Sequence, residues 1–418
     1  MGIGDSTVGR MDDVTGVASR ASALAVERPI RPCPVCGSGI HDVLYEQRFE
    51  DFAAGSITDA YDVVACRSCG MCFASGLPEH GRFAEYYGQS SKYDMGAAGA
   101  EVSRFDAQRY RDEAAFIAAH VADRSRSVLD IGTATGDLLV ALRDLGFTNL
   151  HGVEPSAEAA RKARELHGLD VIPGDIRTAK ELAEEFDLVS LVAVLEHLVD
   201  PASALREVAA LLSTTGILYL LVPDATSFSE HVNAPYQEFS VEHINYFTSA
   251  SLSNLLAMVG LHVSVQQRTV LEQSEDSEGG ALEVLCQRST APAEIQFDAA
   301  GLHALRAYVD LSARKEAGVV AKINELAESQ SPIFVWGTGT NTLHLLIASR
   351  LAECNIVAFL DSNPHYAGRE LAGRPVMIPT AVANPDAPIL VASAISQTAI
   401  ATAARTLFGQ DVPLILLY

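Results

Sequence analysis

Short apolar runs alternate with segments of helical periodicity over the central part of the chain. The runs at 127–131, 150–154 and 186–193 have the length of buried strands, and residues 137–143 repeat apolar side chains at helical spacing. Strands that alternate with helices form a parallel sheet covered on both faces. The pattern predicts such a sheet, preceded by an amphipathic helix at 105–121. Its further strands are expected at 171–172 and 216–222, with a closing antiparallel pair at 262–269 and 283–286.

A second, smaller α/β pattern occupies the last part of the chain. It follows a linker at 289–294 and begins with a long helix at 302–329. Apolar runs then recur at 332–336, 356–361, 388–393 and 412–417. The region before the central sheet differs, because its alternating segments are short and lie between cysteine-containing turns. We therefore expect a flexible tail (1–30), a small first domain (31–95), a central domain (96–288) and a C-terminal Rossmann-like domain (289–418).

Two Cys-x-x-Cys-Gly turns, CPVCG at 33–37 and CRSCG at 66–70, define the first domain. Each turn presents two thiolates to one point, and two such turns form a closed tetrahedral site of the kind that holds structural zinc. A redox dithiol is the alternative, and the doubled motif disfavours it. The sequence predicts a zinc-binding domain over 31–95 with Zn²⁺ held by Cys33, Cys36, Cys66 and Cys69.

Composition limits the classes of binding partner and the cellular compartment that we expect. The 418 residues include 30 Lys and Arg against 53 Asp and Glu, a net charge of −23, which suits neither a nucleic-acid backbone nor an anionic membrane surface. No apolar run reaches the ~20 residues of a membrane helix, and residues 1–20 lack the apolar core of a secretory signal. An odd number of cysteines, seven, argues against a disulfide framework. We expect a cytoplasmic monomer or homodimer that acts on a small molecule.

The turn after the first central strand, DIGTATGD at 130–137, predicts a nucleoside site. A dinucleotide fingerprint needs glycine where Ala134 stands, because pyrophosphate must approach the backbone there. S-adenosylmethionine (SAM) carries no phosphate and suits this turn better. Glu154 follows Asp130 by 24 residues and ends the second strand, where a carboxylate can accept both ribose hydroxyls. Asp175 follows the third strand and is a candidate acceptor for the adenine amino group.

The order of these features is typical of the class I SAM-dependent methyltransferase fold, an α/β Rossmann-like sheet. Taken singly, Glu154 could be a solvated side chain and His197 a loop histidine. Their joint order, with LEH at 195–197 after the fourth strand, favours a cofactor site at the carboxyl edge of the sheet. The predicted SAM-binding residues are Asp130, Gly132, Thr133, Gly136, Glu154, Pro155, Asp175, Ile176, Glu196 and His197.

The motif order CPVCG, CRSCG, DIGTATGD, EHINYF (242–247) and VWGTGTN (335–341) resembles that of the three-domain sugar C-methyltransferases. The resemblance covers nearly the whole chain after the tail. It implies a zinc-binding first domain, a SAM-binding middle domain and a C-terminal domain that helps to hold a nucleotide-linked sugar. It further implies methylation of carbon 3 of a 4-keto deoxysugar, in natural-product or saccharide biosynthesis.

The same resemblance implies that His243 of the EHINYF motif is the base, with Glu242 and Tyr246 beside it. Removing a proton next to a ketone requires a base that works near neutral pH, which an imidazole does well. Tyr246, Asn245 or a tyrosine of segment 86–93 is expected to donate to the enolate oxygen. A structural histidine is the alternative for His243.

Two departures from the family leave other functions open. The family has a tyrosine where this chain has Ser240, and segment 86–94 matches loosely. An O- or N-methyltransferase on another natural-product or polysaccharide acceptor is therefore an alternative, and a non-catalytic zinc and nucleotide-binding scaffold is another. In the C-terminal domain the turn at 336–340 resembles half of a dinucleotide fingerprint and Asp361 ends the next strand. We expect this turn to hold a nucleotide diphosphate or to be an inherited scaffold turn. His344 and His365 are expected to be core or surface residues.

Overall fold

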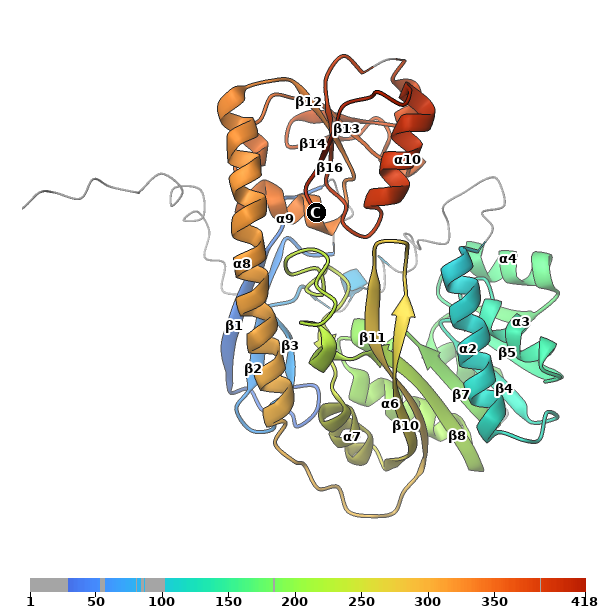
Figure 1. Ribbon diagram of the computed structural model, residues 1–418. Coiled ribbons are helices and arrows are strands. Elements are labelled where there is room, and N and C mark those ends of the chain that lie inside the picture. Colours follow the sequence, from blue (N-terminus) through green and yellow to red (C-terminus); the bar gives the residue numbers. More distant parts are fainter. Residues whose placement is uncertain are drawn as a thin grey trace, which may run out of the picture.

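The computed structural model describes residues 29–52, 57–79, 81–83, 86, 102–182, 185–383 and 385–418. These residues form three sheets, of four, seven and six strands (Figure 1). Most of the predicted tail and of segment 86–94 lies outside the described residues. Within the described parts, no helix combines the length and the apolar character that crossing a membrane would require.

The central sheet has the order β10-β11-β8-β7-β4-β5-β6. Strands β6, β5, β4, β7 and β8 run parallel, and β11 is antiparallel to both β8 and β10. This is the α/β arrangement predicted from the sequence, closed at one edge by the predicted antiparallel pair. The strands are β4 (Ser127–Ile131), β5 (Asn149–Glu154), β6 (Asp170–Pro173), β7 (Phe186–Val192), β8 (Leu212–Pro223), β10 (Leu261–Glu272) and β11 (Glu278–Arg288).

Helices cover both faces of this sheet (Figure 1). Helix α4 begins after Ser156, whose side chain caps it, and ends at Gly168, which adopts the left-handed conformation. Serine is favoured at the start of a helix and glycine just after its end. Two apolar clusters, one on each face, bury the alternate side chains of the parallel strands. The helices are α2 (Arg104–His120), α3 (Asp137–Asp144), α4 (Ala157–His167), α5 (Ile176–Ala179), α6 (Pro201–Leu211) and α7 (Ser249–Met258).

The N-terminal sheet contains a strand from far along the chain. Strands β1 (His41–Arg48), β2 (Ala60–Cys66) and β3 (Cys72–Ser75) form an antiparallel meander. Strand β9 (Asn245–Tyr246) adds to β3, so the EHINYF motif of the central part completes the N-terminal sheet. The two parts therefore share a sheet, which the sequence pattern did not indicate.

The C-terminal sheet has the order β14-β15-β13-β12-β16-β17. All its pairings are parallel except that of β14 with β15, a hairpin that the sequence pattern missed. Its elements are β12 (Ile333–Trp336), β13 (Ile356–Leu360), β14 (Glu370–Leu371), β15 (Arg374–Met377), β16 (Ile389–Val391), β17 (Leu414–Leu416), α9 (Thr340–Ala348) and α10 (Gln397–Phe408).

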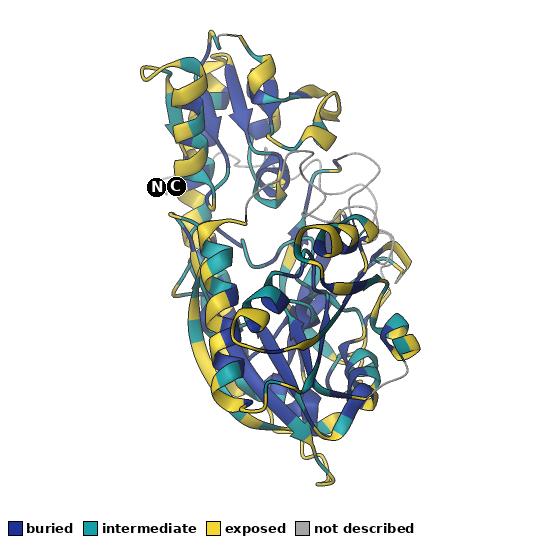
Figure 2. Cartoon of the chain, turned by 90° about the vertical axis from the view of Figure 1, so that its right-hand side faces the viewer, coloured by how far each residue is buried: buried dark blue, intermediate teal, exposed yellow. Residues whose placement is uncertain are grey.

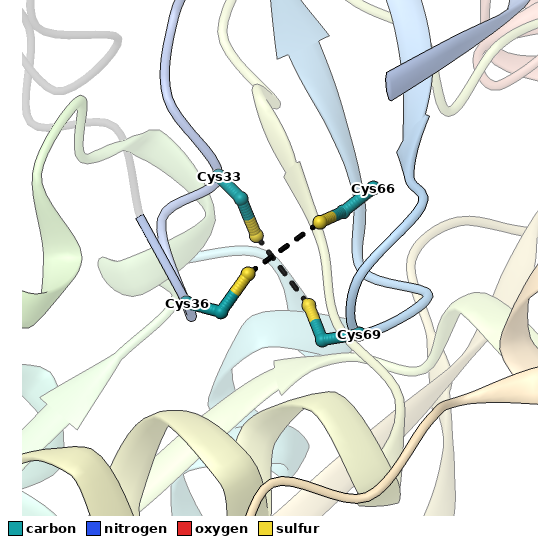
Figure 3. Close-up of side chains that lie close together, drawn as sticks. All are labelled: Cys33, Cys36, Cys66 and Cys69. Carbon is teal, nitrogen blue, oxygen red and sulfur yellow. Dashed lines mark hydrogen bonds between the residues drawn. The ribbon is translucent and has the colours of Figure 1, made fainter. Parts of the chain in front are cut away.

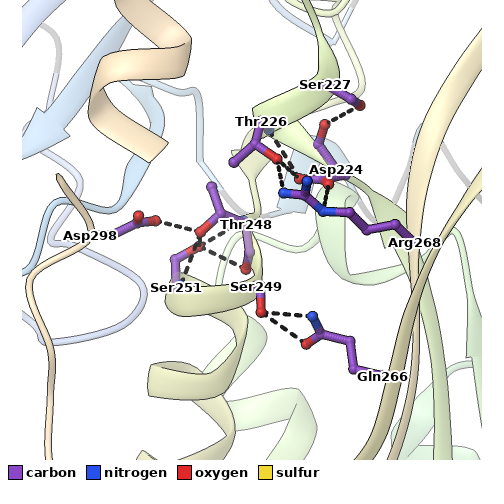
Figure 4. A network of polar contacts seen from close by, with 9 residues as sticks. All are labelled: Asp224, Thr226, Ser227, Thr248, Ser249, Ser251, Gln266, Arg268 and Asp298. Carbon is purple, nitrogen blue, oxygen red and sulfur yellow. Dashed lines mark hydrogen bonds and ion pairs between the residues drawn. The ribbon is translucent and has the colours of Figure 1, made fainter. Parts of the chain in front are cut away.

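Helix α8 (Ala299–Ser329) runs along the N-terminal sheet and reaches the C-terminal one (Figure 1). Its N-cap, Asp298, accepts a hydrogen bond from the hydroxyl of Thr248, which itself caps α7 (Figure 4). The Asp298 N–H donates to the carbonyl of Cys69 at 2.9 Å. A Cβ on Gly70 would meet the Asp298 carbonyl oxygen at 2.6 Å, so the second cysteine turn packs directly on the start of α8.

A second connection links the central sheet to the C-terminal one. At the tip of the hairpin of β10 and β11, Asp276 accepts hydrogen bonds from the N–H and hydroxyl of Thr398 on α10. Within the central part, Arg268 of β10 pairs with Asp224 (Figure 4), and the distance between Arg268 Nε and Asp224 Oδ2 is 2.9 Å. The inner strands of each sheet are buried, whereas the edge strands β1, β10 and β17 and the outer helix faces are largely half-buried or exposed (Figure 2).

Candidate active site

The glycine turn lies between β4 and α3 at the carboxyl edge of the central sheet. Gly132 and Gly136 have φ values of +79° and +84°, which favour glycine, and Ala134 has φ +52°. A Cβ on Gly132 would lie 2.9 Å from Val194 Cγ2. The loop that carries Glu196 and His197 therefore packs against this turn.

Glu154 points back toward the turn from the end of β5. Its Oε2 accepts from the N–H of Ala134 at 2.8 Å and its Oε1 accepts from the N–H of Ser156 at 2.9 Å. The residue is 7% exposed. These bonds orient the carboxylate beside the turn, where a ribose would lie, and a carboxylate can accept about four hydrogen bonds in all. The residues present thus suit the nucleoside of SAM.

Asp130 lies one step deeper, below the turn. It is 3% exposed, and its Oδ1 accepts from the hydroxyl of Ser190 at 2.6 Å. Burial raises the pKa of Asp130 above the ordinary aspartate value. Thr133 beside it is buried as well. Both residues shape the floor of the turn rather than its exposed surface.

The other predicted cofactor residues follow β5 and β6. Pro155 and Asp175 are exposed, and Ile176 is half-buried. Asp175 caps the short helix α5, because its carboxylate accepts from the N–H groups of Arg177 and Thr178. The predicted role for its side chain, accepting the adenine amino group, has to be shared with this cap.

The LEH segment and the EHINYF motif meet beside the turn. The rings of His197 and His243 lie edge to face, with centroids 5.0 Å apart. His197 Nδ1 donates to the carbonyl of Glu242 at 3.1 Å, so the neutral ring carries its lone pair on Nε2. Glu196 Oε1 lies 3.9 Å from that Nε2. The two histidines and the buried carboxylate of Glu196 offer ligand atoms within 4.8 Å of one another, an arrangement that can pass or hold a proton and could also bind a divalent cation.

A buried arginine positions these two segments. The Arg31 guanidinium donates to the carbonyls of Ala74, Leu198, Val199 and Ile244 and to Asn245 Oδ1. The Asn245 amide in turn donates to Leu195 and Leu198. Burial lowers the pKa of Arg31 to about 10, which keeps it charged at neutral pH. Sequence reasoning missed Arg31, whose only signal is its place next to the first cysteine turn.

Ser240 and Tyr86 hold the turn that precedes β9. The hydroxyl of Ser240 accepts from the N–H groups of Glu242 and His243, and the hydroxyl of Tyr86 donates to Glu242 Oε1 at 2.7 Å. Burial and the Glu242 carboxylate raise the pKa of Tyr86. Of the tyrosines in segment 86–93, Tyr86 is the one described.

Tyr246 lies in the apolar core and not at the edge of the sheet. It is 1% exposed, and its hydroxyl lies 3.4 Å from that of Tyr61. Asn245 is engaged with Arg31 and the LEH segment. The structure therefore corrects the expectation that either side chain donates to an enolate oxygen, because both serve the packing of β9 against its neighbours.

The four predicted zinc ligands converge on one point (Figure 3). Cys33 Sγ lies 3.5 Å from Cys69 Sγ, and Cys36 Sγ lies 3.5 Å from Cys66 Sγ. Tetrahedral zinc with Zn–S bonds of about 2.3 Å separates its sulfurs by roughly 3.8 Å. All four are free cysteines. The spacing fits a closed four-thiolate site.

A cavity of about 670 Å³ opens at the carboxyl edge of the C-terminal sheet. The turn at 336–340, Asp361 and His344 line one side, and segment 234–240 of the central part lines the other. Ser240 belongs to this lining, so the cavity reaches the turn that carries His243.

Comparison with known proteins identifies the central part. Residues 102–265 match the family model described as a methyltransferase domain. The chain contains a SAM-dependent methyltransferase domain. This match agrees with the strand order of the central sheet and favours an enzyme over the scaffold alternative.

Curated relatives include ubiquinone biosynthesis O-methyltransferases. That of Xanthomonas campestris is 33% identical over 112 residues, which are 25% of this chain and 46% of that protein. That of Pseudomonas aeruginosa is 36% identical over 102 residues, 23% of this chain and 43% of that protein. The chain spans less than half the length of these relatives. Among solved structures, the SAM-bound magnesium protoporphyrin IX methyltransferase of Synechocystis is 15% identical, with a TM-score of 0.37, 49% of this chain and 95% of that chain covered.

Proposed function

We propose that the methyltransferase domain methylates a carbon of a nucleotide-linked keto sugar, with His243 as the base. One observation carries the proposal. His243 lies against His197, whose loop packs on the glycine turn through Val194, and Ser240, three residues before His243, lines the cavity of the C-terminal sheet. One loop thus joins a candidate base to a cavity large enough for a nucleotide.

The geometry suggests how these side chains act. His243 takes the proton from the carbon next to the ketone and keeps it while the resulting enolate carbon is methylated. Bound SAM supplies the electrophilic methyl group. The buried Glu196 carboxylate stabilises positive charge on the neighbouring imidazoles. Tyr86, whose hydroxyl donates to Glu242 Oε1, would have to exchange that bond for one to the sugar oxygen in order to act as a donor.

Proton exchange tests the base directly. In D₂O and without SAM, the protein should exchange the hydrogen next to the ketone of a nucleotide-linked 4-keto-6-deoxysugar, and His243→Ala should abolish both exchange and methyl transfer. His303→Ala, an exposed position on α8, is the matched control. Full methyl transfer by His243→Ala would refute this role.

Methylation of oxygen is the second candidate. Two observations favour it. The curated relatives are named O-methyltransferases. Ser240, bonded to its own turn, stands where the sugar C-methyltransferases have a tyrosine. NMR of the product separates the two, because a C-methyl and an O-methyl group differ in chemical shift and coupling.

We also propose a structural role for zinc. Four thiolates leave no open coordination position for water, so Cys33, Cys36, Cys66 and Cys69 would hold Zn²⁺ without a share in the reaction. The contact of the second cysteine turn with Asp298 supports this, because the metal would then stabilise the start of α8.

A further inference from the structure

Helix α10 forms one wall of the cavity at the C-terminal sheet, and its own N-cap residue does not cap it. Ile395, Ser396, Ala399 and Ile400 line the cavity. Ser396, at the N-cap position, makes no side-chain hydrogen bond to the first turn. The first N–H groups of a helix have no partner within the helix, and a serine at this position commonly supplies one. The start of α10 therefore depends on a group from elsewhere.

That group is the carboxylate of Asp276 in the hairpin tip (273–278) between β10 and β11, which reaches from the central sheet toward the C-terminal part (Figure 1). Asp276 Oδ2 accepts from the N–H of Thr398 at 2.7 Å, and its Oδ1 accepts from the Thr398 hydroxyl at 2.6 Å. The hydroxyl of Ser274 donates to the carbonyl of Ile395 at 2.5 Å. A carboxylate at this end of a helix also interacts favourably with the helix dipole. The central part of the chain thus caps a helix of the C-terminal part.

The same hairpin tip holds the opposite wall of the cavity. Asn233 Nδ2 donates to the hydroxyl of Ser277 at 2.8 Å, and His231 Nδ1 lies 3.1 Å from Glu278 Oε1. Segment 234–240, which lines the cavity, follows Asn233 directly. Two backbone N–H groups of the tip donate to the Ser277 carbonyl, at 2.8 and 3.1 Å, and close the turn. One closed turn is therefore bonded to both walls.

Packing contributes little on this side of α10, so the position of the helix depends on the bonds of the hairpin tip. A second cavity of about 670 Å³ lies between the tip, α10 and Phe105 of α2. Elsewhere the C-terminal part is held by α9, where the Leu343 carbonyl accepts from the N–H of Glu50 at 3.0 Å. Loss of the bonds at the tip would let α10 move away from segment 234–240 while these other contacts remain.

We propose that the hairpin tip is a strap that sets the width of the cavity, with Asp276 as its positioning residue. The strap keeps α10 close to segment 234–240, and Ser240 at the end of that segment belongs to the turn that carries His243. The distance from a bound acceptor to His243 then depends on whether the strap is closed. The inference rests on the proposed function only for the acceptor that fills the cavity, and it involves no covalent step.

The single tryptophan of the chain reports on this wall of the cavity. Trp336 lines the cavity, is 3% exposed, and packs edge-on against Phe408 of α10 with ring centroids 6.4 Å apart. In the full zinc-loaded chain, Asp276→Ala should increase the quenching of Trp336 by acrylamide. Loss of a helix cap corresponds to a shift of about 2- to 30-fold between the closed and the open form. Hydrogen exchange of residues 396–400 and 231–240 should rise as well.

Two control variants separate the cap from the charge. Asp276→Asn should behave like the wild type, because its amide can accept from the N–H of Thr398 and donate to the hydroxyl, and asparagine caps helices as well as aspartate does. Glu275→Ala removes a charge from the same tip and breaks only an exposed pair with Arg104, so it should also behave like the wild type. Unchanged quenching and exchange in a folded Asp276→Ala protein would overturn the strap and leave the proposed function standing.

Steady-state kinetics test the positioning role. With SAM and a nucleotide-linked 4-keto-6-deoxysugar, Asp276→Ala should raise the KM for the sugar by about twofold or more and leave the affinity for S-adenosylhomocysteine unchanged, and Asp276→Asn should restore the KM. An unchanged KM in a variant with increased Trp336 quenching would overturn the positioning role. If the wild type neither exchanges nor methylates the sugar, the proposed function fails, and the quenching still decides whether the strap exists.

Discussion

The carboxylate of Glu154 offers the sharpest test of the cofactor site. Its two oxygens are oriented by the N–H groups of Ala134 and Ser156, and the side chain is 93% buried, from an exposed fraction of 7%. Glu154→Gln keeps the shape, removes the charge and puts an NH₂ group against one of those N–H donors. Both changes act where the ribose hydroxyls of SAM would bind.

The expected loss follows from the bonds removed. Hydrogen bonds to a charged group contribute about 1.5–3 kcal/mol each, and the amide can replace at most one of two ribose contacts. One lost contact corresponds to roughly 10- to 150-fold weaker binding of the cofactor. Glu154→Ala removes both contacts and should weaken binding further.

Calorimetric titration with S-adenosylhomocysteine measures this loss, and thermal unfolding shows whether the turn survives. Glu158→Gln, an acidic position on α4 that pairs with Arg161 away from the turn, is the control. A folded Glu154→Gln protein that binds S-adenosylhomocysteine as tightly as the wild type would refute the assignment of the ribose site to β5.

Three other predictions concern stability. Arg31→Met leaves buried carbonyls without their donor and should destabilise the protein by about 3–5 kcal/mol in urea unfolding, whereas Arg67→Met, an exposed ion pair, should not. Burial raises the pKa of Glu113 to about 8, above its unfolded value. The contribution of Glu113 to stability is therefore present in acid and is lost as pH rises through about 8. Between acid pH and pH above about 8, the Tm should fall less in Glu113→Gln than in the wild type. Cys36→Ser should lower the zinc content, measured by emission spectrometry, and the Tm, and full metal content would count against the site.

Much of the fold could be predicted from local pattern. The strands of the central sheet and the long helix are confirmed because their apolar spacing and their bounding turns are local properties of the chain. The addition of β9 to the N-terminal sheet could not be predicted. Two residues, Asn245 and Tyr246, are too short a strand to show periodicity, and their pairing with β3 depends on the folded positions of both parts.

The candidate site divides in the same way. Two sets of residues lie as their spacing predicts. Glu154 reaches the turn that begins at Gly132, because both follow neighbouring parallel strands. The four cysteines converge, because they belong to two local turns.

The contact of His197 with His243 joins segments 46 residues apart and was not predicted, because the resemblance gave only a role for His243. Tyr246 was assigned by its place in the motif, but both residues of β9 are buried and Tyr246 lies in the apolar core. Arg31 has no motif, and its partners are carbonyls and an amide oxygen that only the fold brings near. His344 is buried, which agrees with its expected place in the core or at the surface.

The two α/β units share one hydrogen-bond arrangement at the end of their second strand. In each, the acid that ends the second strand accepts from an N–H of the glycine turn and from the N–H two residues after itself, Glu154 from Ala134 and Ser156 and Asp361 from Thr338 and Asn363. Asp361 also accepts from the Thr338 hydroxyl, so three of its roughly four acceptor positions are taken by its own chain.

Asp361 therefore has little acceptor capacity left for a ligand, and the C-terminal unit would have to hold one by other groups. Its turn has Gly339 where the central turn has Ala134, so phosphate can approach the backbone there. The same chain geometry thus recurs in both units, with glycine in the C-terminal turn at the position of Ala134.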